Sequence, residues 1–263
     1  MKNWSRLVLI VLLASSTGFA VEVTQHEGSA HGFPAVFQID GQKIANGDFS
    51  QSFDGEQLHI RIVYRYETGE RIEEKAILRQ GSQLIQEQWS WRESNGTGVE
   101  REFLVDFKAQ TATAKKREDG QLKSWSERVE VQPGRTFAGF GFTLALQNLR
   151  KRLIKGETIE LEAIGFNPKP VVVTVELAHG GVDEMKMGGR IITGDRFVVH
   201  PKLPAMARIF VHVPDTKIWL TKPPAGFLRW EGPLAEPKDP IIRVDLIPGE
   251  QSGPARVVDS VSK

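Results

Sequence analysis

Most of the chain alternates apolar and polar residues with a period of two, which is the pattern of half-buried antiparallel strands. The longest such run extends from 58 to 66, and its apolar positions are Leu58, Ile60, Ile62, Tyr64 and Tyr66. Further runs follow at hairpin spacing, separated by turn sequences such as Asp40-Gly41, Asp54-Gly55 and Glu118-Asp119-Gly120. The pattern predicts a meander of roughly six to eight strands between 34 and 132.

One segment has the pattern of an amphipathic helix instead, and its predicted boundaries are 136–155. Its apolar residues recur at helical spacing and share one face; they are Ala138, Phe142, Ala145, Leu146, Leu149 and Leu153. The opposite face is polar and carries Thr143, Gln147, Asn148, Arg150 and Lys151. Basic residues in the last turn and Gly156 after it predict the end of the helix. We expect a curved sheet to cover the apolar face.

A second strand-rich block is predicted from 157 to 247. Asn167-Pro168-Lys169-Pro170 is expected to force an extended or turn backbone, and the next strand is expected from Val171 to Leu177, before Gly180-Gly181. Segment 201–210 fits a short helix or an apolar crossover, and the prolines between 214 and 240 restrict the last strands to edges or irregular segments. Both blocks and the helix are expected to form a single β-rich domain, 34–247, after a flexible lead-in at 21–33 and before a disordered tail at 248–263.

The first 20 residues predict a secretory signal peptide. Lys2 and Arg6 precede an apolar run from Leu7 to Ala14, and small residues lead to cleavage after Ala20. The run is too short for a membrane-spanning helix, which needs about 20 residues, and no later segment is apolar enough to span a bilayer. The chain has no cysteine, which excludes disulfides and thiolate metal sites. We expect export to a bacterial periplasm.

The charge balance gives no reason to expect a nucleic-acid partner. The sequence has 34 Lys and Arg against 33 Asp and Glu, and loss of Lys2 and Arg6 with the signal leaves a net charge of −1. A nucleic-acid-binding domain is usually basic, with Lys and Arg clustered on one face.

No motif for catalysis, phosphate binding or zinc binding occurs, so the sequence favours a non-enzymatic protein without a cofactor or metal. A hydrolase or isomerase stays an alternative, with Glu87, Glu93, Asp195 or His200 as acid or base. His179 and Asp183 could ligate a metal, but polar loops often contain histidine without one. Glu87 and Arg101 fall on the same predicted inner face, where a mutual salt bridge explains them as well as catalysis does.

Aromatic residues give the strongest indication of a ligand site. Those near the helix and in the last strands could line a concave sheet that holds an acyl chain, with an arginine at the rim reading a headgroup. The candidate binding residues are Trp89, Trp91, Arg92, Arg101, Phe103, Phe137, Phe140 and Trp219. The alternative is that these rings only fill a core. Gly139-Phe140-Gly141 could similarly cradle an anion, but close packing against the sheet is the favoured interpretation.

The helix end and two later segments carry a family resemblance. They are Leu149-Arg150, Leu153 and Gly156-Glu157, then 220–224 and 227–232. Together they resemble uncharacterised bacterial envelope proteins, which are similar to the periplasmic lipoprotein carriers. The resemblance covers roughly 48–247 in order of elements. It implies a half-open antiparallel barrel over a helical plug, without catalytic residues.

The expected protein is therefore mainly β, with a curved antiparallel sheet or half-open barrel of β-clam or lipocalin-like form around one central helix. Its expected role is to bind a lipid or lipidated partner in an apolar cleft. The alternative is a structural or assembly component that binds another envelope protein.

Overall fold

The computed structural model describes residues 19–187, 189–203, 213–222 and 226–247. Most of the predicted signal peptide, the predicted tail and most of segment 201–210 lie outside these residues. Within them the chain forms one sheet of 15 strands in the order β8-β7-β6-β5-β4-β3-β2-β1-β15-β14-β13-β12-β11-β10-β9, together with one helix, α1. All strand pairs are antiparallel except β9 with β10. The predicted fold class, mainly β with one helix, is confirmed.

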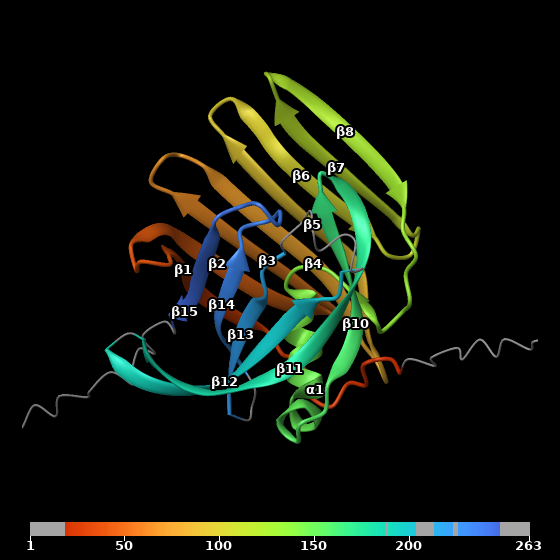
Figure 1. Ribbon diagram of the computed structural model, residues 1–263, viewed down its shortest axis with the longest axis vertical. Helices are drawn as coiled ribbons and strands as arrows, with labels where there is room; N and C mark the ends of the chain where they lie inside the picture. Colours follow the sequence, from red (N-terminus) through yellow and green to blue (C-terminus); the bar gives the residue numbers. More distant parts are fainter. Residues whose placement is uncertain (1–18, 188, 204–212, 223–225, 248–263) are drawn as a thin grey trace, which may run out of the picture.

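The first eight strands form the predicted meander, in which each strand pairs with the next along the chain (Figure 1). They are β1 (Ala30–Gln38), β2 (Lys43–Asp54), β3 (Gln57–Tyr66), β4 (Arg71–Gln80), β5 (Leu84–Asn95), β6 (Gly98–Asp106), β7 (Thr111–Glu118) and β8 (Gln121–Arg128). We call them the N-terminal half of the sheet.

The strands after β8 form the C-terminal half. They are β9 (Thr136–Phe137), β10 (Ile159–Asn167), β11 (Lys169–Met187), β12 (Arg190–Pro201), β13 (Thr216–Thr221), β14 (Phe227–Pro233) and β15 (Ile241–Ile247). The halves are joined where β1 pairs with β15, with Val36 opposite Val244. This long-range pairing makes the two strand-rich blocks one continuous sheet.

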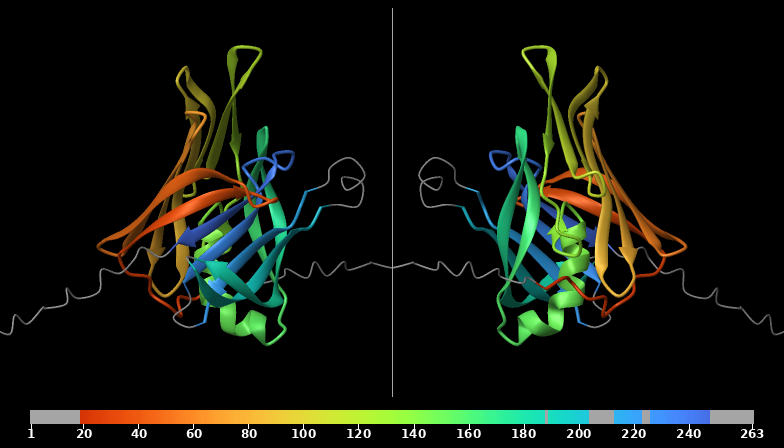
Figure 2. Two further views of the ribbon diagram at one scale, coloured as in Figure 1. Left: turned by 90° about the vertical axis from the view of Figure 1, so that its left-hand side faces the viewer. Right: turned by 90° about the vertical axis from the view of Figure 1, so that its right-hand side faces the viewer.

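The sheet bends so that its two halves face each other, and α1 lies between them near one end (Figure 2). β11 also approaches β7 and β8, although no ladder joins them. Lys169 of β11 lies 3.7 Å from Glu127 of β8, measured from Nζ to Oε1. The result is a half-open barrel whose inner faces and helix share one core.

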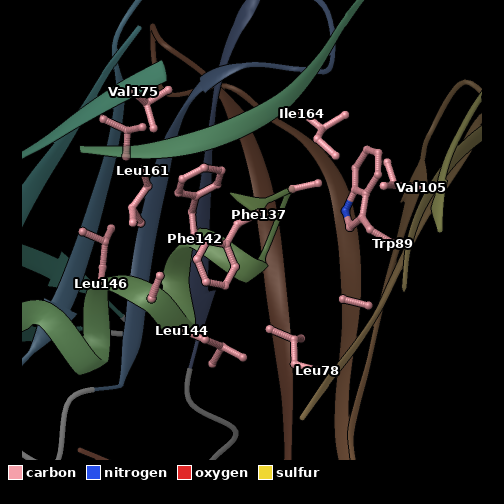
Figure 3. Close-up of a cluster of buried hydrophobic side chains, with 14 of the residues drawn as sticks. Leu78, Trp89, Val105, Phe137, Phe142, Leu144, Leu146, Leu161, Ile164 and Val175 are labelled. Atoms are coloured by element: carbon pink, nitrogen blue, oxygen red, sulfur yellow. The ribbon is translucent and has the colours of Figure 1, made fainter. Parts of the chain in front are cut away.

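That core contains side chains from both halves and from the helix (Figure 3). Leu78, Trp89 and Val105 come from the N-terminal half, and Leu161, Ile164 and Val175 from the C-terminal half. Phe137 and the helix residues Phe142, Leu144 and Leu146 lie between them (Figure 3). The helix therefore stabilises the contact between the halves by burying apolar surface from each.

Helix α1 (Gly141–Ile154) is shorter than predicted and more buried. It begins at 141 because β9 and the left-handed Gly139, with φ of +51°, precede it. It ends as predicted, with Gly156 in the left-handed conformation. Its supposedly polar face is covered, since Thr143, Gln147 and Asn148 are all buried between the halves. No helix among the described residues is long and apolar enough to cross a membrane.

The segment before β1 differs from the flexible lead-in predicted for 21–33. Val21 is fully buried, donates its backbone N–H to the Gly134 carbonyl and accepts a hydrogen bond from the Leu84 amide. Asn148 of the helix accepts hydrogen bonds through Oδ1 from the amides of Thr24 and Gln25, at 2.7 and 2.9 Å. These contacts hold the segment against the helix and β5, and β1 begins at Ala30.

The predicted strand end at Leu177 is wrong, because the strand continues through Gly180-Gly181. The ladder between β11 and β12 shifts register between His179 and Gly181, so the glycines form a bulge and β11 continues to Met187. A bulge inserts an unpaired residue and bends the strand without ending it.

Candidate ligand-binding cavity

A cavity of about 630 Å³ lies between the two halves of the sheet and the start of α1. Pockets for small molecules typically have volumes of about 300–1,000 Å³. Its walls are mostly apolar, and the aromatic residues that line it are Phe49, Tyr64, Trp89, Trp91, Phe103, Phe140, Phe142, Phe166, Phe227 and Trp230. The space is therefore large and apolar enough for a small hydrophobic ligand.

The charged residues described in the lining of this cavity are all acidic. They are Glu27, Glu74 and Glu236, and no lysine, arginine or histidine is among the described lining residues. Glu236 is paired with Arg101 and Lys116, which are not among them. The described part of the lining thus offers an anionic environment and no cation for an acidic headgroup.

Glu74 lies in the middle of a row of apolar residues across the inner face of the N-terminal half. Strand register places Ile62 of β3 opposite Glu74 on one side and Trp91 of β5 opposite it on the other. The row continues to Phe49 beyond Ile62 and to Phe103 beyond Trp91. An isolated carboxylate in such a row must be hydrogen-bonded or bind a partner, because burying an unpaired charge is costly.

One carboxylate oxygen of Glu74 is hydrogen-bonded at the N-terminus of α1. Oε1 accepts hydrogen bonds from Trp89 Nε1 at 2.8 Å and from the backbone N–H of Phe140 at 2.7 Å. Burial raises the pKa of Glu74, and these two hydrogen bonds oppose that shift because they favour the charged form. The protein's own carboxylate therefore satisfies a backbone donor at the positive end of the helix.

Close packing around Gly139 makes this arrangement possible. A Cβ atom at position 139 would lie 2.1 Å from both Glu74 Oε1 and Trp89 Nε1, and one at Gly141 would lie 2.4 Å from Gln86 Oε1. Gln86 in turn accepts the Ala138 amide through Oε1 and donates to the Ala138 carbonyl, at 2.8 and 3.1 Å. The predicted close packing of the Gly139-Phe140-Gly141 segment is confirmed.

The raised pKa of Glu74 predicts how its replacement changes stability with pH. The folded state binds more protons than the unfolded chain between the ordinary pKa of 4.5 and the higher folded value, so stability falls as pH rises through that interval. Glu74→Gln removes this loss and keeps an oxygen for Trp89 and Phe140. We expect the variant to gain stability relative to the wild type between about pH 4 and about pH 7.5.

Urea unfolding of both proteins at the two pH values measures that difference. The pKa of Glu27 is also raised by burial, but Glu27 is present in both proteins and its effect cancels. A stability difference that is the same at both pH values would contradict the assigned direction.

An ionic cluster closes one part of the cavity wall. Arg101 of β6 donates from Nε to Glu93 at 2.5 Å and from Nη1 to Glu236 at 3.2 Å and Asp239 at 2.6 Å. Lys116 of β7 also pairs with Glu236, at 2.5 Å. Glu236 and Asp239 belong to the loop 234–240 between β14 and β15, which also contributes cavity-lining residues. The cluster thus binds a loop of the C-terminal half to the N-terminal half.

The structure brings together half of the predicted binding residues. Trp89, Trp91, Phe103 and Phe140 all line the cavity. The Phe140 ring also contacts two other lining rings, Phe49 and Phe227, with centroids 5.4 and 5.5 Å apart.

The other four predicted residues do not line the cavity. Phe137 is fully buried and packs edge-on against Phe142, with ring centroids 6.0 Å apart. Trp219 lies in a separate cluster and donates to Asp183 at 2.7 Å. Arg92 is exposed and lies 3.9 Å from Glu102. Arg101 belongs to the ionic cluster, so neither arginine is placed to read a headgroup inside the cavity.

The predicted salt bridge between Glu87 and Arg101 is wrong. The ladder between β4 and β5 pairs Ile77 with Gln88 and Leu78 with Gln86, which leaves Glu87 as an extra residue in a bulge. The bulge shifts the inward positions of β5 from Leu84 and Gln86 to Trp89 and Trp91, and Glu87 instead pairs with Arg79 at 3.0 Å.

The residues considered for acid–base or metal chemistry have separate structural partners. Asp195 accepts hydrogen bonds from Arg150 and lies 3.4 Å from His179, while Asp183 binds Arg196 and Trp219. His200 pairs with Asp215 on the surface, at 2.7 Å. In the part of the chain that the structure describes, no three His, Asp or Glu residues are grouped to hold a metal ion.

Glu74 was not singled out from the sequence, although a signal for it exists. The inward positions of β4 are Ile72, Glu74, Ala76 and Leu78, which alternate with outward residues. A single carboxylate in an otherwise apolar face is the signal, since such a face is expected to be buried.

No protein-family model and no curated protein sequence matches this chain. The solved structures that are similar to it include two bacterial proteins. One is described as a beta-barrel-like protein of the domain of unknown function DUF1849 from Brucella abortus; the identity is 6%, the TM-score is 0.48, and 84% of this chain and 96% of that chain are covered. The other is the hypothetical lipoprotein YmcC from Escherichia coli K12, with 7% identity, a TM-score of 0.32, and coverage of 82% and 83%. The expected likeness to bacterial proteins of unknown function is therefore confirmed.

Proposed function

We propose that this protein is a non-enzymatic binding protein that holds an apolar small molecule or a lipid chain in the cavity between its two half-sheets. The observation that carries the proposal is the cavity of about 630 Å³, which is lined by both halves of the sheet and by the start of α1. A region that served only as hydrophobic core would be packed as densely as an organic crystal, with few voids larger than a water molecule.

The composition of the lining supports an apolar ligand. Its walls carry many aromatic and branched aliphatic side chains and few polar groups, which is the usual composition of a small-molecule site. Each methylene group that moves from water into such a space contributes about 0.8 kcal/mol. A chain of several methylenes could therefore bind without a strong polar contact.

We further propose that the protein acts in the bacterial periplasm. The positively charged start, the short apolar run and the small residues before position 21 have the order of a cleaved secretory signal. The lack of cysteine fits an exported protein that relies on its core alone. Fractionation of cells producing the full chain tests this, with a shortened protein in the periplasmic fraction as the expected result.

A variant that fills the cavity tests the binding proposal. Gly165 of β10 lines the cavity opposite Val171, and a Cβ atom added there meets no atom within 4 Å. We expect Gly165→Phe to fold and to weaken binding of a linear alcohol such as 1-decanol by about tenfold or more, because the ring occupies the ligand's volume. Quenching of the tryptophans that line the cavity gives the dissociation constant.

Gly81→Phe is the matched control. Gly81 lies between β4 and β5, has equally open space around it and does not line the cavity, so binding should stay at the wild-type value. In the wild type, affinity should also rise about fourfold for each added methylene until the cavity is full. Equal binding by both variants, or affinity that does not depend on chain length, would contradict the proposal.

A further inference from the structure

We propose that the cavity is selective for a hydrophobic amine, and that Glu74 binds the ammonium group while the apolar walls bind the hydrocarbon part. This inference rests on the proposed function, because it assigns a ligand class to the same cavity. It differs from the expectation drawn from the sequence, in which an arginine at the rim of the cavity binds an acidic headgroup.

One of the two carboxylate oxygens of Glu74 is available to a ligand. Oε1 is occupied by Trp89 and Phe140, but among the described residues Oε2 has no hydrogen-bond partner and no basic side chain forms an ion pair with Glu74. The side chain is only half-buried although it lies on the inner face, and it lines the cavity. Its remaining accessible surface therefore faces the space that a ligand would occupy.

The hydrogen bonds that Glu74 already makes favour its charged form. Two N–H donors to one oxygen favour the carboxylate over the carboxylic acid, but burial opposes ionisation. An ammonium group within hydrogen-bond distance of Oε2 would supply the missing opposite charge. The site thus suits a cation, and the described residues supply none.

The charge of the lining disfavours anions. No basic residue is among its described residues, and Glu27, which is hydrogen-bonded to Gln25 but forms no ion pair with a described residue, is a further acid in it. A carboxylate or phosphate headgroup beside Glu74 would lose its hydration and meet a like charge. Anionic lipids and fatty acids should therefore bind less well than amines of the same chain length.

Aromatic rings near the carboxylate also suit a cation. Tyr64 and Phe140 line the cavity, and the pKa of Tyr64 is raised by burial and by the neighbouring charge of Glu74. An ammonium group close to the face of such a ring gains additional electrostatic stabilisation. A neutral alcohol can donate a hydrogen bond to Oε2, but it gains neither the ion pair with Glu74 nor the interaction of a cation with the rings.

Three ligands with one hydrocarbon chain test the inference: dodecylamine, 1-dodecanol and dodecanoate, each titrated below micelle formation at about pH 7.5. For the wild type we expect the amine to bind about tenfold or more tighter than the alcohol, and dodecanoate to bind more weakly than the alcohol. Glu74→Gln should remove the preference for the amine, so that amine and alcohol bind with similar affinity, because glutamine keeps an acceptor oxygen but carries no charge.

Gly81→Phe is again the control, since Gly81 has open space around it and does not line the cavity. This variant should keep the preference for the amine. Equal binding of amine and alcohol, a preference for dodecanoate, or an amine preference that survives Glu74→Gln would overturn the inference while alcohol binding still supports the proposed function. If none of the three ligands binds, the proposed function itself fails.

Discussion

Replacing Arg101 by alanine is expected to lower the free energy of unfolding by about 3–5 kcal/mol, because it leaves carboxylates without their partner in a largely buried cluster. The Arg101 side chain is 12% exposed and that of Glu236 is 5% exposed. Arg101 also lies over the Trp91 ring, with its Cζ atom 5.2 Å from the ring centroid. The substitution therefore removes an ion pair, packing against an indole and the attachment of loop 234–240.

Urea unfolding measures this effect, and Arg92→Ala is the matched control. Arg92 lies on the neighbouring strand, but its side chain is 52% exposed, and its Nε atom lies as far as 3.9 Å from Glu102 Oε1. The loss of such a weak surface ion pair should change stability by at most about 0.5 kcal/mol. Because the loop forms part of the cavity wall, Arg101→Ala should also release a bound alcohol faster. Similar stability losses in both variants would show that the cluster does not hold the halves together.

The second large effect is expected from Leu146→Ala, which truncates the helix where it fills the space between the halves. Leu146 is fully buried in the core that includes Phe137, Leu161 and Val175. Truncation of a buried leucine typically costs about 2–5 kcal/mol, and the upper part of this range is expected where the walls cannot collapse. Rigid strands on both sides of α1 provide that condition.

Chemical denaturation of Leu146→Ala and of Ile154→Ala separates this effect from helix propensity. Ile154 is the last residue of the helix and is 39% exposed, so its truncation should change stability much less. If the two variants lost the same stability, the helix would not act as a plug between the half-sheets.

The strands and the end of the helix were predictable because local patterns determine them. Alternation with a period of two predicted the run from 58 to 66, which lies within β3, and Gly156 marked the helix end. These features depend on residues within a few positions of each other, so the sequence displays them directly.

Other features depend on contacts between distant segments. The bulge at Glu87 changes which residues of β5 face inward, and the local alternation of apolar and polar residues does not indicate the bulge. The cluster joins Arg101 to Asp239, and the pairing of β1 with β15 joins the first and last described strands of the chain. Thr143 and Asn148 fit a solvated helix face in the sequence, but Thr143 lines the cavity and Asn148 binds the amides of Thr24 and Gln25.

The same distinction between local patterns and contacts of distant segments applies to the candidate site. Trp89, Trp91 and Phe103 were identified because aromatic residues on one strand face tend to meet. The arginines were assigned the wrong role, because their position relative to the cavity depends on the loop 234–240 and on strand register. Glu74 was missed, although its place in an apolar face could have identified it.

The measurement that tests the central claim most directly is native mass spectrometry of the full chain produced in a bacterium and purified from its periplasm, followed by solvent extraction. The account predicts an added mass of a small hydrophobic compound that contains an amine, present on the wild type and on Gly81→Phe and absent from Gly165→Phe. A wild-type protein that carries no added mass and binds neither 1-decanol nor dodecylamine would contradict it.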